Sequence, residues 1–311
     1  MFYLKSYIED KESDGDSMKT GWLVVNRFLQ TNKFTDLYDR LKKGAEQAGL
    51  GLFVKTGCDL LNETSSGFLK EQEKPDFALF WDKDVRLAKG LESMGIRVFN
   101  SAKSIEICDD KSLTHQALAG VVPMPKTIMA PMTYEGVGYT DLSFVEIVGE
   151  ALGFPMVIKE CFGSFGAQVY LVHTLQEAKE KAKSLAGTPF LFQECIATSF
   201  GRDVRLQVVG GRVIAAMLRY SETGDFRAGI TSGGTMKTYE PTNRQTELAV
   251  KVCKTLGLDF AGVDFLFGKN DEPILCEVNS NAHFKNLYDC TGVDAAAAIM
   301  EHIADKLEGR A

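Results

Sequence analysis

Apolar and polar residues alternate along the first hundred residues in blocks that predict strands separated by helices. Short apolar runs, typical of buried strands, lie at residues 21–26, 52–54, 76–81 and 96–99. Between them, apolar side chains recur at helical spacing from Phe34 to Ala48 and again over residues 85–94. Strands that alternate with helices favour a parallel sheet. We therefore predict that residues 1–104 form one small parallel-sheet α/β domain.

The pattern changes after this domain and predicts two further units that mix helices and strands. Residues 105–189 combine a helical stretch at 111–119 with strands at 156–160 and 168–173, and a loop region at 121–142. Ser143-x-x-Glu146 and Thr174-x-x-Glu177 are typical of capping boxes that open helices. In residues 190–311 strands dominate, at 190–196, 203–209 and 212–220, before helices at 243–256 and from Asp294.

Two apolar strands at 261–267 and 273–278, joined by the polar turn 269–272, are predicted to form an antiparallel hairpin. The expected register places Asp264 opposite Glu277, and the two-residue period places Asn279 on the face of Glu277. Facing carboxylates destabilise a sheet unless a cation lies between them, and oxygen ligands suit Mg²⁺. The alternative is a solvated strand end with ordinary surface acids.

Composition narrows the class of protein. The 311 residues are 45% hydrophobic and 25% charged, as in globular proteins, and the net charge of −7 argues against nucleic acid or an anionic membrane as partner. No apolar run is long enough to span a membrane, and the N-terminal residues lack the apolar core of a signal peptide. Seven scattered cysteines without CxxC spacing indicate reduced thiols. We expect a cytoplasmic protein.

A lysine and a short glycine loop follow the strand at 156–160. Lys159 precedes Gly163, Ser164 and Gly166, and another strand comes next. Glycines let backbone N–H groups approach phosphate oxygens, and lysine adds a positive charge. The sequence contains neither GxxxxGK[ST] nor a usable GxGxxG, so a P-loop and a dinucleotide fingerprint are excluded. A plain β-hairpin with glycines in its turn is the alternative.

Several motifs occur together in an order that resembles one family. They are Lys159 followed by GSFGA, LFQEC at 191–195, Asp203-Val-Arg205, Arg219, Asp225-Phe-Arg227, Gly262-Val-Asp264 and Glu277-Val-Asn279. This order resembles the ATP-grasp carboxylate–amine ligases, above all their RimK-like branch, which adds amino acids such as glutamate to a carboxyl group. The resemblance covers residues 105–308. It implies an ATP-grasp fold, in which two α+β lobes (105–189 and 190–311) clasp ATP, preceded by the α/β domain.

The resemblance also implies a role for each matching residue. Lys111 and Lys159 match lysines that hold the nucleotide phosphates, together with Gly163, Ser164 and Gly166 of the glycine loop. Glu194 and Cys195 match the segment whose backbone binds adenine, and Asp203 matches the residue that reaches the ribose. Arg219 and Arg227 match basic residues near the γ-phosphate and the acyl-phosphate. Asp264, Glu277 and Asn279 match ligands of Mg²⁺, with Mn²⁺ as an alternative ion.

Other interpretations stay open for individual residues. Lys111 could be a solvated lysine in the first turn of a helix, Arg205 fits a structural ion pair better than a catalytic role, and His283 fits hydrogen-bonded scaffold better than a ligand. The sequence also departs from the family. Gly229 stands where an Asn is usual, and Asn279 is followed by Ser-Asn-Ala-His-Phe and not by the usual small-Pro-Gly. Both departures border the acceptor region, so the substrate cannot be carried over from the family.

The implied reaction is ATP-dependent joining of a carboxylate to an amine through an acyl-phosphate, with release of ADP and phosphate. The partners would be ATP and small amino-acid or peptide substrates, and the oligomeric state is left open, a homo-oligomer included. Two alternatives remain. The first is a dipeptide ligase that resembles D-alanine–D-alanine ligase, and the second is a regulator that binds ATP without turnover, which the altered position Gly229 keeps open.

Overall fold

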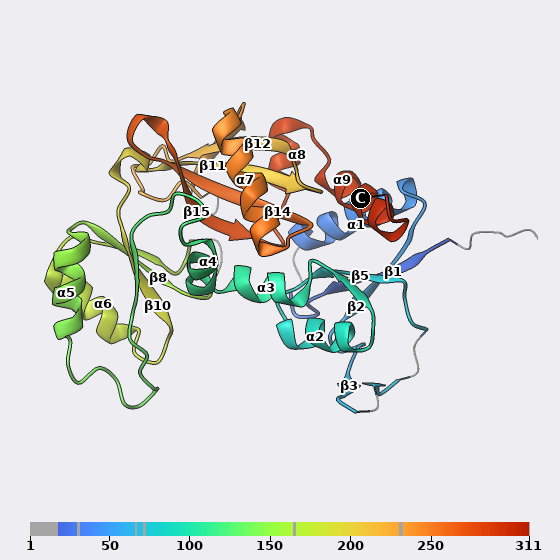
Figure 1. The fold of residues 1–311 in the computed structure, drawn as a ribbon, viewed down its shortest axis with the longest axis horizontal. Helices are drawn as coiled ribbons and strands as arrows, with labels where there is room; N and C mark the ends of the chain where they lie inside the picture. The colour runs from blue at the N-terminus through green and yellow to red at the C-terminus, as the bar shows by residue number, and fades with distance from the viewer. Residues whose placement is uncertain are drawn as a thin grey trace, which may run out of the picture.

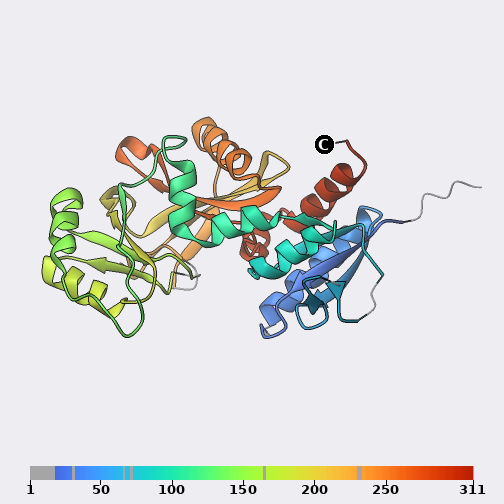
Figure 2. The ribbon, with the colours of Figure 1, turned by 60° about the horizontal axis from the view of Figure 1, so that its bottom comes forward.

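The computed structural model describes residues 18–29, 32–65, 67–70, 73–163, 166–229 and 233–310. Its strands form three larger sheets and a two-stranded hairpin of β3 (Asn62–Glu63) and β4 (Gly67–Phe68). The first and second sheets lie at opposite ends of the long axis, with the third between them (Figures 1 and 2). Within the described ranges, no helix has both the length and the apolar character needed to cross a membrane.

The first sheet is parallel, as predicted. Its strand order is β2 (Gly51–Thr56), β1 (Thr20–Val25), β5 (Phe77–Trp81) and β6 (Arg97–Phe99). One face packs against α1 (Asn32–Gln47), and the other packs against α2 (Val85–Ser93) and α3 (Ala102–Asp109). Because both faces are covered, every residue of β5 is buried. Helix α3 and the β3–β4 hairpin were not predicted.

The second sheet is antiparallel and follows α4 (Lys111–Leu118). Its order is β7 (Thr127–Met129), β10 (Phe190–Glu194), β8 (Met156–Glu160) and β9 (Val169–Val172). Helices α5 (Ser143–Leu152) and α6 (Leu175–Ser184) pack on it. The loop predicted at 121–142 is therefore partly wrong, because three of its residues form the edge strand β7. Three residues are too short a run to show a strand pattern.

The two predicted capping boxes have different outcomes. Thr174 caps α6 and accepts a hydrogen bond from the backbone N–H of Glu177. At α5 the prediction is wrong, because the helix already begins at Ser143 and its N-cap, Leu142, makes no side-chain bond. The Asp141 carboxylate accepts instead from the backbone N–H of Ser143 at 2.8 Å and from its hydroxyl at 2.7 Å, so a residue before the helix takes the place of the expected cap.

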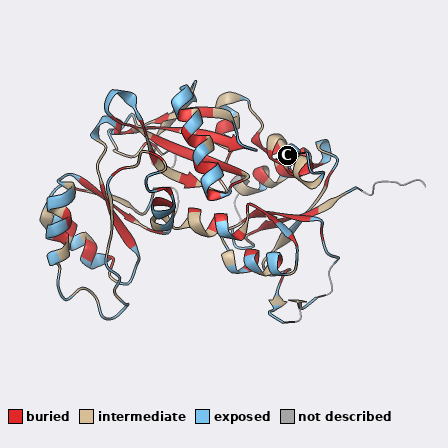
Figure 3. Ribbon diagram, viewed as in Figure 1, coloured by how far each residue is buried: buried red, intermediate tan, exposed pale blue. Residues whose placement is uncertain are grey.

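The third sheet is also antiparallel and contains the predicted hairpin. Its order is β13 (Thr235–Thr238), β12 (Arg212–Tyr220), β11 (Arg202–Val209), β14 (Phe260–Phe267) and β15 (Pro273–Asn279). Helix α7 (Asn243–Leu256) covers one face, while α8 (Lys285–Thr291) and α9 (Ala295–Leu307) lie toward the first sheet. Short 3₁₀ turns occur at Ala197–Ser199 and Lys269–Asp271. Buried residues run through the strands of all three sheets (Figure 3).

The first and third sheets are joined by a shared core and by one buried amide. Asn100 donates from Nδ2 to the carbonyls of Phe260 and Ser280 at 2.8 and 2.9 Å. Its Oδ1 accepts from the N–H groups of Asp259 and Phe260 at 2.7 and 3.3 Å. Because one side chain satisfies four backbone groups at the ends of β14 and β15, it fixes the end of β6 against the third sheet.

The predicted domain boundaries at residues 104 and 189 stay a prediction, but two features bear on them. Strand β10 is hydrogen-bonded between β7 and β8, so it belongs to the second sheet although it begins at Phe190. In addition, side chains of α1 and β5 share one hydrophobic core with side chains of α9. The first and third sheets therefore form a continuous scaffold, to which the second sheet is attached through β10 and α4.

Candidate active site

A cavity of about 650 Å³ is lined by residues from all three sheets, and it gathers most of the residues predicted for the site. Eleven of them line it: Lys111, Lys159, Gly166, Glu194, Cys195, Asp203, Arg219, Arg227, Asp264, Glu277 and Asn279. Gly163 is not among the lining residues, and Ser164 lies outside the described residues. The first and last of these motifs are more than a hundred residues apart in the sequence, yet they meet in this cavity.

The predicted pairing of Asp264 with Glu277 is confirmed, and it depends on a β-bulge. Phe265 pairs with Leu275, whereas Asp264 pairs with Glu277, so Cys276 is an extra residue on β15. In a regular ladder Asp264 would face Cys276, and Glu277 would point to the opposite side of the sheet. The bulge therefore turns the second carboxylate toward the cavity.

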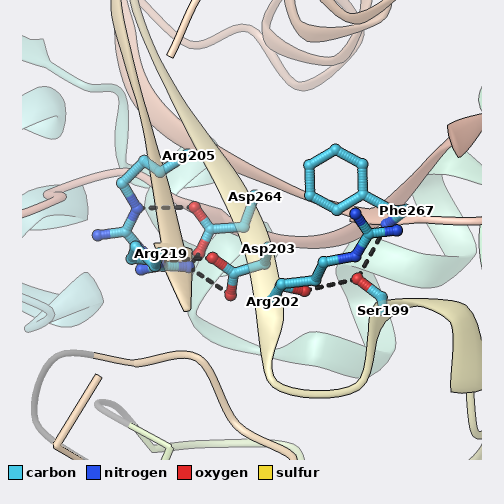
Figure 4. A network of polar contacts seen from close by, with 7 residues as sticks. All are labelled: Ser199, Arg202, Asp203, Arg205, Arg219, Asp264 and Phe267. Carbon is cyan, nitrogen blue, oxygen red and sulfur yellow. Dashed lines mark hydrogen bonds and ion pairs between the residues drawn. The ribbon is translucent and has the colours of Figure 1, made fainter. Parts of the chain in front are cut away.

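Two arginines neutralise Asp264 (Figure 4). Arg205 binds it through two hydrogen bonds, Nε to Oδ1 at 2.6 Å and Nη2 to Oδ2 at 2.7 Å. Arg219 donates from Nη2 to Oδ2 of Asp264 at 2.8 Å and binds Asp203 through two further bonds at 2.6 and 2.9 Å. The structural ion pair predicted for Arg205 is confirmed, and its partner is Asp264 on the neighbouring strand.

The ion pairs determine the charge of Asp264, which is only 2% exposed. Burial by itself would raise the pKa of this carboxyl, but Arg205 and Arg219 outweigh it and lower the pKa to about 2. From the sequence we expect a cation beside Asp264. Two guanidinium groups of the protein already lie there and neutralise it. A metal ion would add to this arrangement.

Asp264, Glu277 and Asn279 still fit a magnesium ion. Oδ1 of Asp264 accepts one hydrogen bond and keeps a lone pair, and among the described residues no lysine or arginine forms an ion pair with Glu277. Nδ2 of Asn279 is buried without a hydrogen-bond acceptor, which a phosphate oxygen could supply, and its Oδ1 would be the metal ligand. The described residues contain no cluster of three His, Cys, Asp or Glu, so phosphate oxygens would have to complete the shell.

Both predicted lysines lie between the lobes. Nζ of Lys111 donates to the carbonyl of Gly163 at 3.3 Å, and burial lowers the pKa of this lysine. The alternative of a solvated surface lysine is therefore wrong. Lys159 is 8% exposed, and its Nζ lies 3.9 Å from the Sγ atom of Cys276 at the bulge of β15. Lys111 at the start of α4 and Lys159 on β8 thus present two ammonium groups to the edge of the third sheet.

The glycine loop is shaped by its own contacts and by Arg227. Gly163 has a φ of +127°, and a Cβ there would come within 2.4 Å of the Gln168 side chain, so the position requires glycine. Arg227 donates from Nη1 to the carbonyl of Gly166 at 3.0 Å, and Asp225 fixes its guanidinium through bonds at 3.1 and 2.8 Å. A second cation from the third sheet therefore contacts the loop.

The segment between the lobes is anchored near the predicted adenine site. Glu194 accepts from the backbone N–H of Lys126 at 2.9 Å, and its own N–H donates to the Lys126 carbonyl at 2.9 Å. Cys195 follows at the end of β10 and lines the cavity. Asp203, predicted to reach the ribose, has one hydrogen bond from Arg219 at each of its two oxygens.

Several residues that line the cavity were not predicted from the sequence. Two of them could have been predicted from their position directly after a buried strand. Asn26 and Asp82 follow buried parallel strands, at the carboxyl edge where α/β sheets bind ligands. Gln193 lies within LFQEC but was given no role, and Asn281 and Asn286 also line the cavity without an assigned role. His115, which is in no motif, is buried beside Gln193, and the Nε2 atoms of the two side chains lie 3.2 Å apart.

The two carboxylates that face each other should differ in their effect on stability. Asp264→Asn removes the counter-charge of two buried guanidinium groups, and we expect a loss of about 3 kcal/mol in the free energy of unfolding. Glu277→Gln removes a carboxylate without an ion pair, so its effect should stay within about 0.5 kcal/mol. Urea denaturation of both variants measures this difference. Equal losses would show that the network does not stabilise the sheet.

The buried imidazole should make stability depend on pH. Burial, helped by the charge of Lys159, lowers the pKa of His115 from 6.5 to about 4. Between these values the unfolded chain binds a proton that the folded chain does not, so stability falls as the pH drops from 6.5 to 4. The contribution is on the order of 3 kcal/mol. His115→Gln should flatten the pH profile of the unfolding free energy over this window, whereas the exposed His173→Gln should not. Parallel profiles for all three proteins would contradict this.

Comparison with known proteins identifies the family of the chain. A family model described as a RimK-like ATP-grasp domain matches residues 108–303. The chain is 34% identical over 233 residues to beta-citrylglutamate synthase B of Danio rerio, covering 74% of this chain and 56% of that protein. It is 36% identical over 225 residues to a probable alpha-L-glutamate ligase of Trichodesmium erythraeum, covering 71% of this chain and 72% of that one. The chain thus spans little more than half of the fish synthase.

The fold agrees as well. The crystal structure of a RimK domain ATP-grasp protein from Sphaerobacter thermophilus superposes with a TM-score of 0.68 at 20% identity. That similarity covers 91% of this chain and 98% of the other. The ATP-grasp fold with a preceding parallel-sheet domain, predicted from the sequence, is therefore confirmed. The chain belongs to the RimK-like ATP-grasp family.

Proposed function

We propose that the protein is an ADP-forming ligase that joins a carboxylate to the amino group of an amino acid or peptide. The observation that supports this most is the convergence in one cavity of two lysines, from α4 and β8, with two carboxylates from the third sheet. A site of this kind suits phosphoryl transfer, in which the protein positions phosphates and neutralises their charge. The names of both relatives contain glutamate, so L-glutamate is the first amine to test.

The nucleotide would lie between the second and third sheets. Lys111, Lys159 and the loop of Gly163, Ser164 and Gly166 would hold the phosphates, while the backbone of Glu194 and Cys195 would bind adenine. Asp203 is proposed for the ribose. Because each of its oxygens accepts only one bond from Arg219, each keeps a lone pair for a ribose hydroxyl.

Mg²⁺, or Mn²⁺, would be held by Asp264, Glu277 and Asn279, and it would supply positive charge beside the terminal phosphates. The protein contributes the remaining charge compensation through its own side chains. Arg205 and Arg219 keep Asp264 ionised down to a pKa of about 2, so this ligand stays ready to bind at any physiological pH. The bulge at Cys276 keeps Glu277 on the same face.

The proposed chemistry has two steps. A substrate carboxylate attacks the γ-phosphorus of ATP, the bond to the ADP oxygen breaks, and an acyl-phosphate forms. The amine then attacks the acyl carbon, the bond to the phosphate oxygen breaks, and phosphate leaves while the nitrogen loses a proton. Lys159 and Arg227 are proposed to stabilise the transferring phosphoryl group. Arg219 is proposed to bind the acyl-phosphate through Nη1, which donates to no residue that the structure describes.

We include the cellular location and the partners of the enzyme in the same proposal. All seven cysteines are free thiols, and burial raises the pKa of Cys108, Cys161 and Cys253, as expected of unreactive core residues. This use of cysteine supports a cytoplasmic enzyme that acts on small substrates. We propose neither nucleic acid nor a membrane surface as partner.

The chemistry predicts its own products. With ATP, Mg²⁺ and the correct carboxylic acid, we expect ADP and phosphate and neither AMP nor pyrophosphate. Hydroxylamine should intercept the acyl-phosphate as a hydroxamate in the absence of an amine substrate. Glu277→Gln should abolish this signal, whereas the exposed Glu272→Gln should retain it. These products are measured by assaying ADP, AMP and hydroxamate for wild type and both variants with a panel of carboxylic acids.

Three outcomes are distinguishable. AMP as product would contradict attack at the γ-phosphorus. A persistent blank despite tight ATP binding would favour the regulator without turnover. ADP formation with D-alanine alone would favour the dipeptide ligase.

A further inference from the structure

One end of the cavity is formed by the first sheet and was not used by the proposed nucleotide site. Asn26 follows β1, and Asp82 follows β5, so both lie at the carboxyl edge of the parallel sheet. Phe34 and Trp81 line the cavity beside them. This end therefore combines a carboxylate and an amide with aromatic side chains.

Asp82 is an anion without a paired cation. The backbone N–H of Lys83 donates to its Oδ1 at 2.7 Å, and Nδ2 of Asn26 approaches its two oxygens at the long distances of 3.4 and 3.3 Å. Among the described residues no lysine or arginine forms a salt bridge with Asp82. The charge of Lys83 still opposes the rise in the pKa of Asp82, although the Lys83 ammonium itself pairs with Asp109. Burial, with a smaller contribution from the charge of Asp84, raises the pKa of Asp82. A partly buried carboxylate of this kind gains from a cationic ligand.

The position of Asp82 is fixed against the third sheet by its neighbour. The indole of Trp81 stacks on Phe260 with ring centroids 5.7 Å apart and meets Phe284 edge-on at 5.6 Å. Phe260 begins β14, and Phe284 follows the loop after β15, so the carboxylate is held to the strands that carry the proposed metal ligands. A second contact, Phe34 edge-on to His283 at 5.8 Å, joins the same two parts.

The two ends of the cavity have opposite charge. Lys111, Lys159 and Arg227 surround the end proposed for phosphates, where an ammonium group would be repelled. Asp82 offers the opposite charge. The amine substrate of an amide ligase arrives as a cation at neutral pH.

We propose that Asp82, assisted by Asn26, binds the ammonium group of the amine substrate. This inference rests on the proposed ligase function and assigns the first sheet a role in that reaction as the amine subsite. The competing explanation is that Asp82 only caps the turn by accepting the N–H bond of Lys83. Asp82→Asn separates the two, because an asparagine keeps the acceptor oxygen and removes only the charge.

Equilibrium binding tests the subsite without requiring the carboxylic acid to be known. The protein is saturated with Mg²⁺ and a non-hydrolysable ATP analogue, and each of the common L-amino acids is titrated in a calorimeter beside its N-acetyl derivative. We expect at least one amino acid, L-glutamate first, to bind, and its N-acetyl derivative to bind roughly tenfold or more weakly because it lacks the ammonium group. Asp82→Asn should weaken the free amino acid by a similar factor and leave the N-acetyl derivative unchanged.

The matched control is Asp84→Asn, which removes a charge two residues away. Asparagine is also a good N-cap, so it can replace Asp84 at the start of α2, and binding should equal that of the wild type. The proposal is overturned if Asp82→Asn binds the amino acid as well as wild type does, or if wild type binds no free amino acid better than its N-acetyl form. The second result needs no variant, so it stands even if Asp82→Asn does not fold. Binding of the ATP analogue and ADP release by wild type report separately on the ligase function.

Discussion

The candidate site depends on four charged side chains within one sheet, three of them buried and the fourth, Arg205, partly buried. Asp203, Arg205, Arg219 and Asp264 alternate acid and base across β11, β12 and β14, and every bond between them is 2.9 Å or shorter. Any one of these charges alone would be expensive to bury, and only their mutual neutralisation makes the arrangement stable. The same network keeps Asp264 ionised at the cavity wall. The same ion pairs therefore stabilise the sheet and keep Asp264 charged for a metal ion.

A second constraint is the rigid joint between the first and third sheets. Asn100 satisfies four backbone groups at the ends of β14 and β15, and Trp81 packs between two phenylalanines of the third sheet. The second sheet meets this scaffold at the cavity through Lys159 and Arg227. The proposed phosphate-binding groups thus come from α4, from the second sheet and, through Arg227, from the lobe of the third sheet, while the proposed metal and amine groups come from the scaffold that the first and third sheets form.

Much of this could be read from the sequence, and the exceptions have physical reasons. Strands and helices with strong periodicity were predicted within a few residues, as at α7 and β12. The sequence predicted that Asp264 faces Glu277. It did not predict the bulge at Cys276 that produces this pairing, because one extra residue does not visibly change an apolar pattern. The Arg219 bond to Asp264 crosses β11, and it arises only because β14, distant in sequence, pairs with β11. Asp82 could have been found, since it follows a buried parallel strand, yet no motif contains it.

The central claim is that the cavity binds the triphosphate of ATP through groups from both lobes, and calorimetry of Mg²⁺–ATP binding tests it most directly. Lys159→Ala should weaken ATP by roughly tenfold or more, the cost of about 1.5–3 kcal/mol for charge-assisted hydrogen bonds, while its thermal stability stays near that of wild type. The exposed Lys183→Ala on the same lobe should bind as wild type does. Equal ATP affinity of Lys159→Ala and wild type, or no binding of ATP to the wild-type protein, would contradict the account.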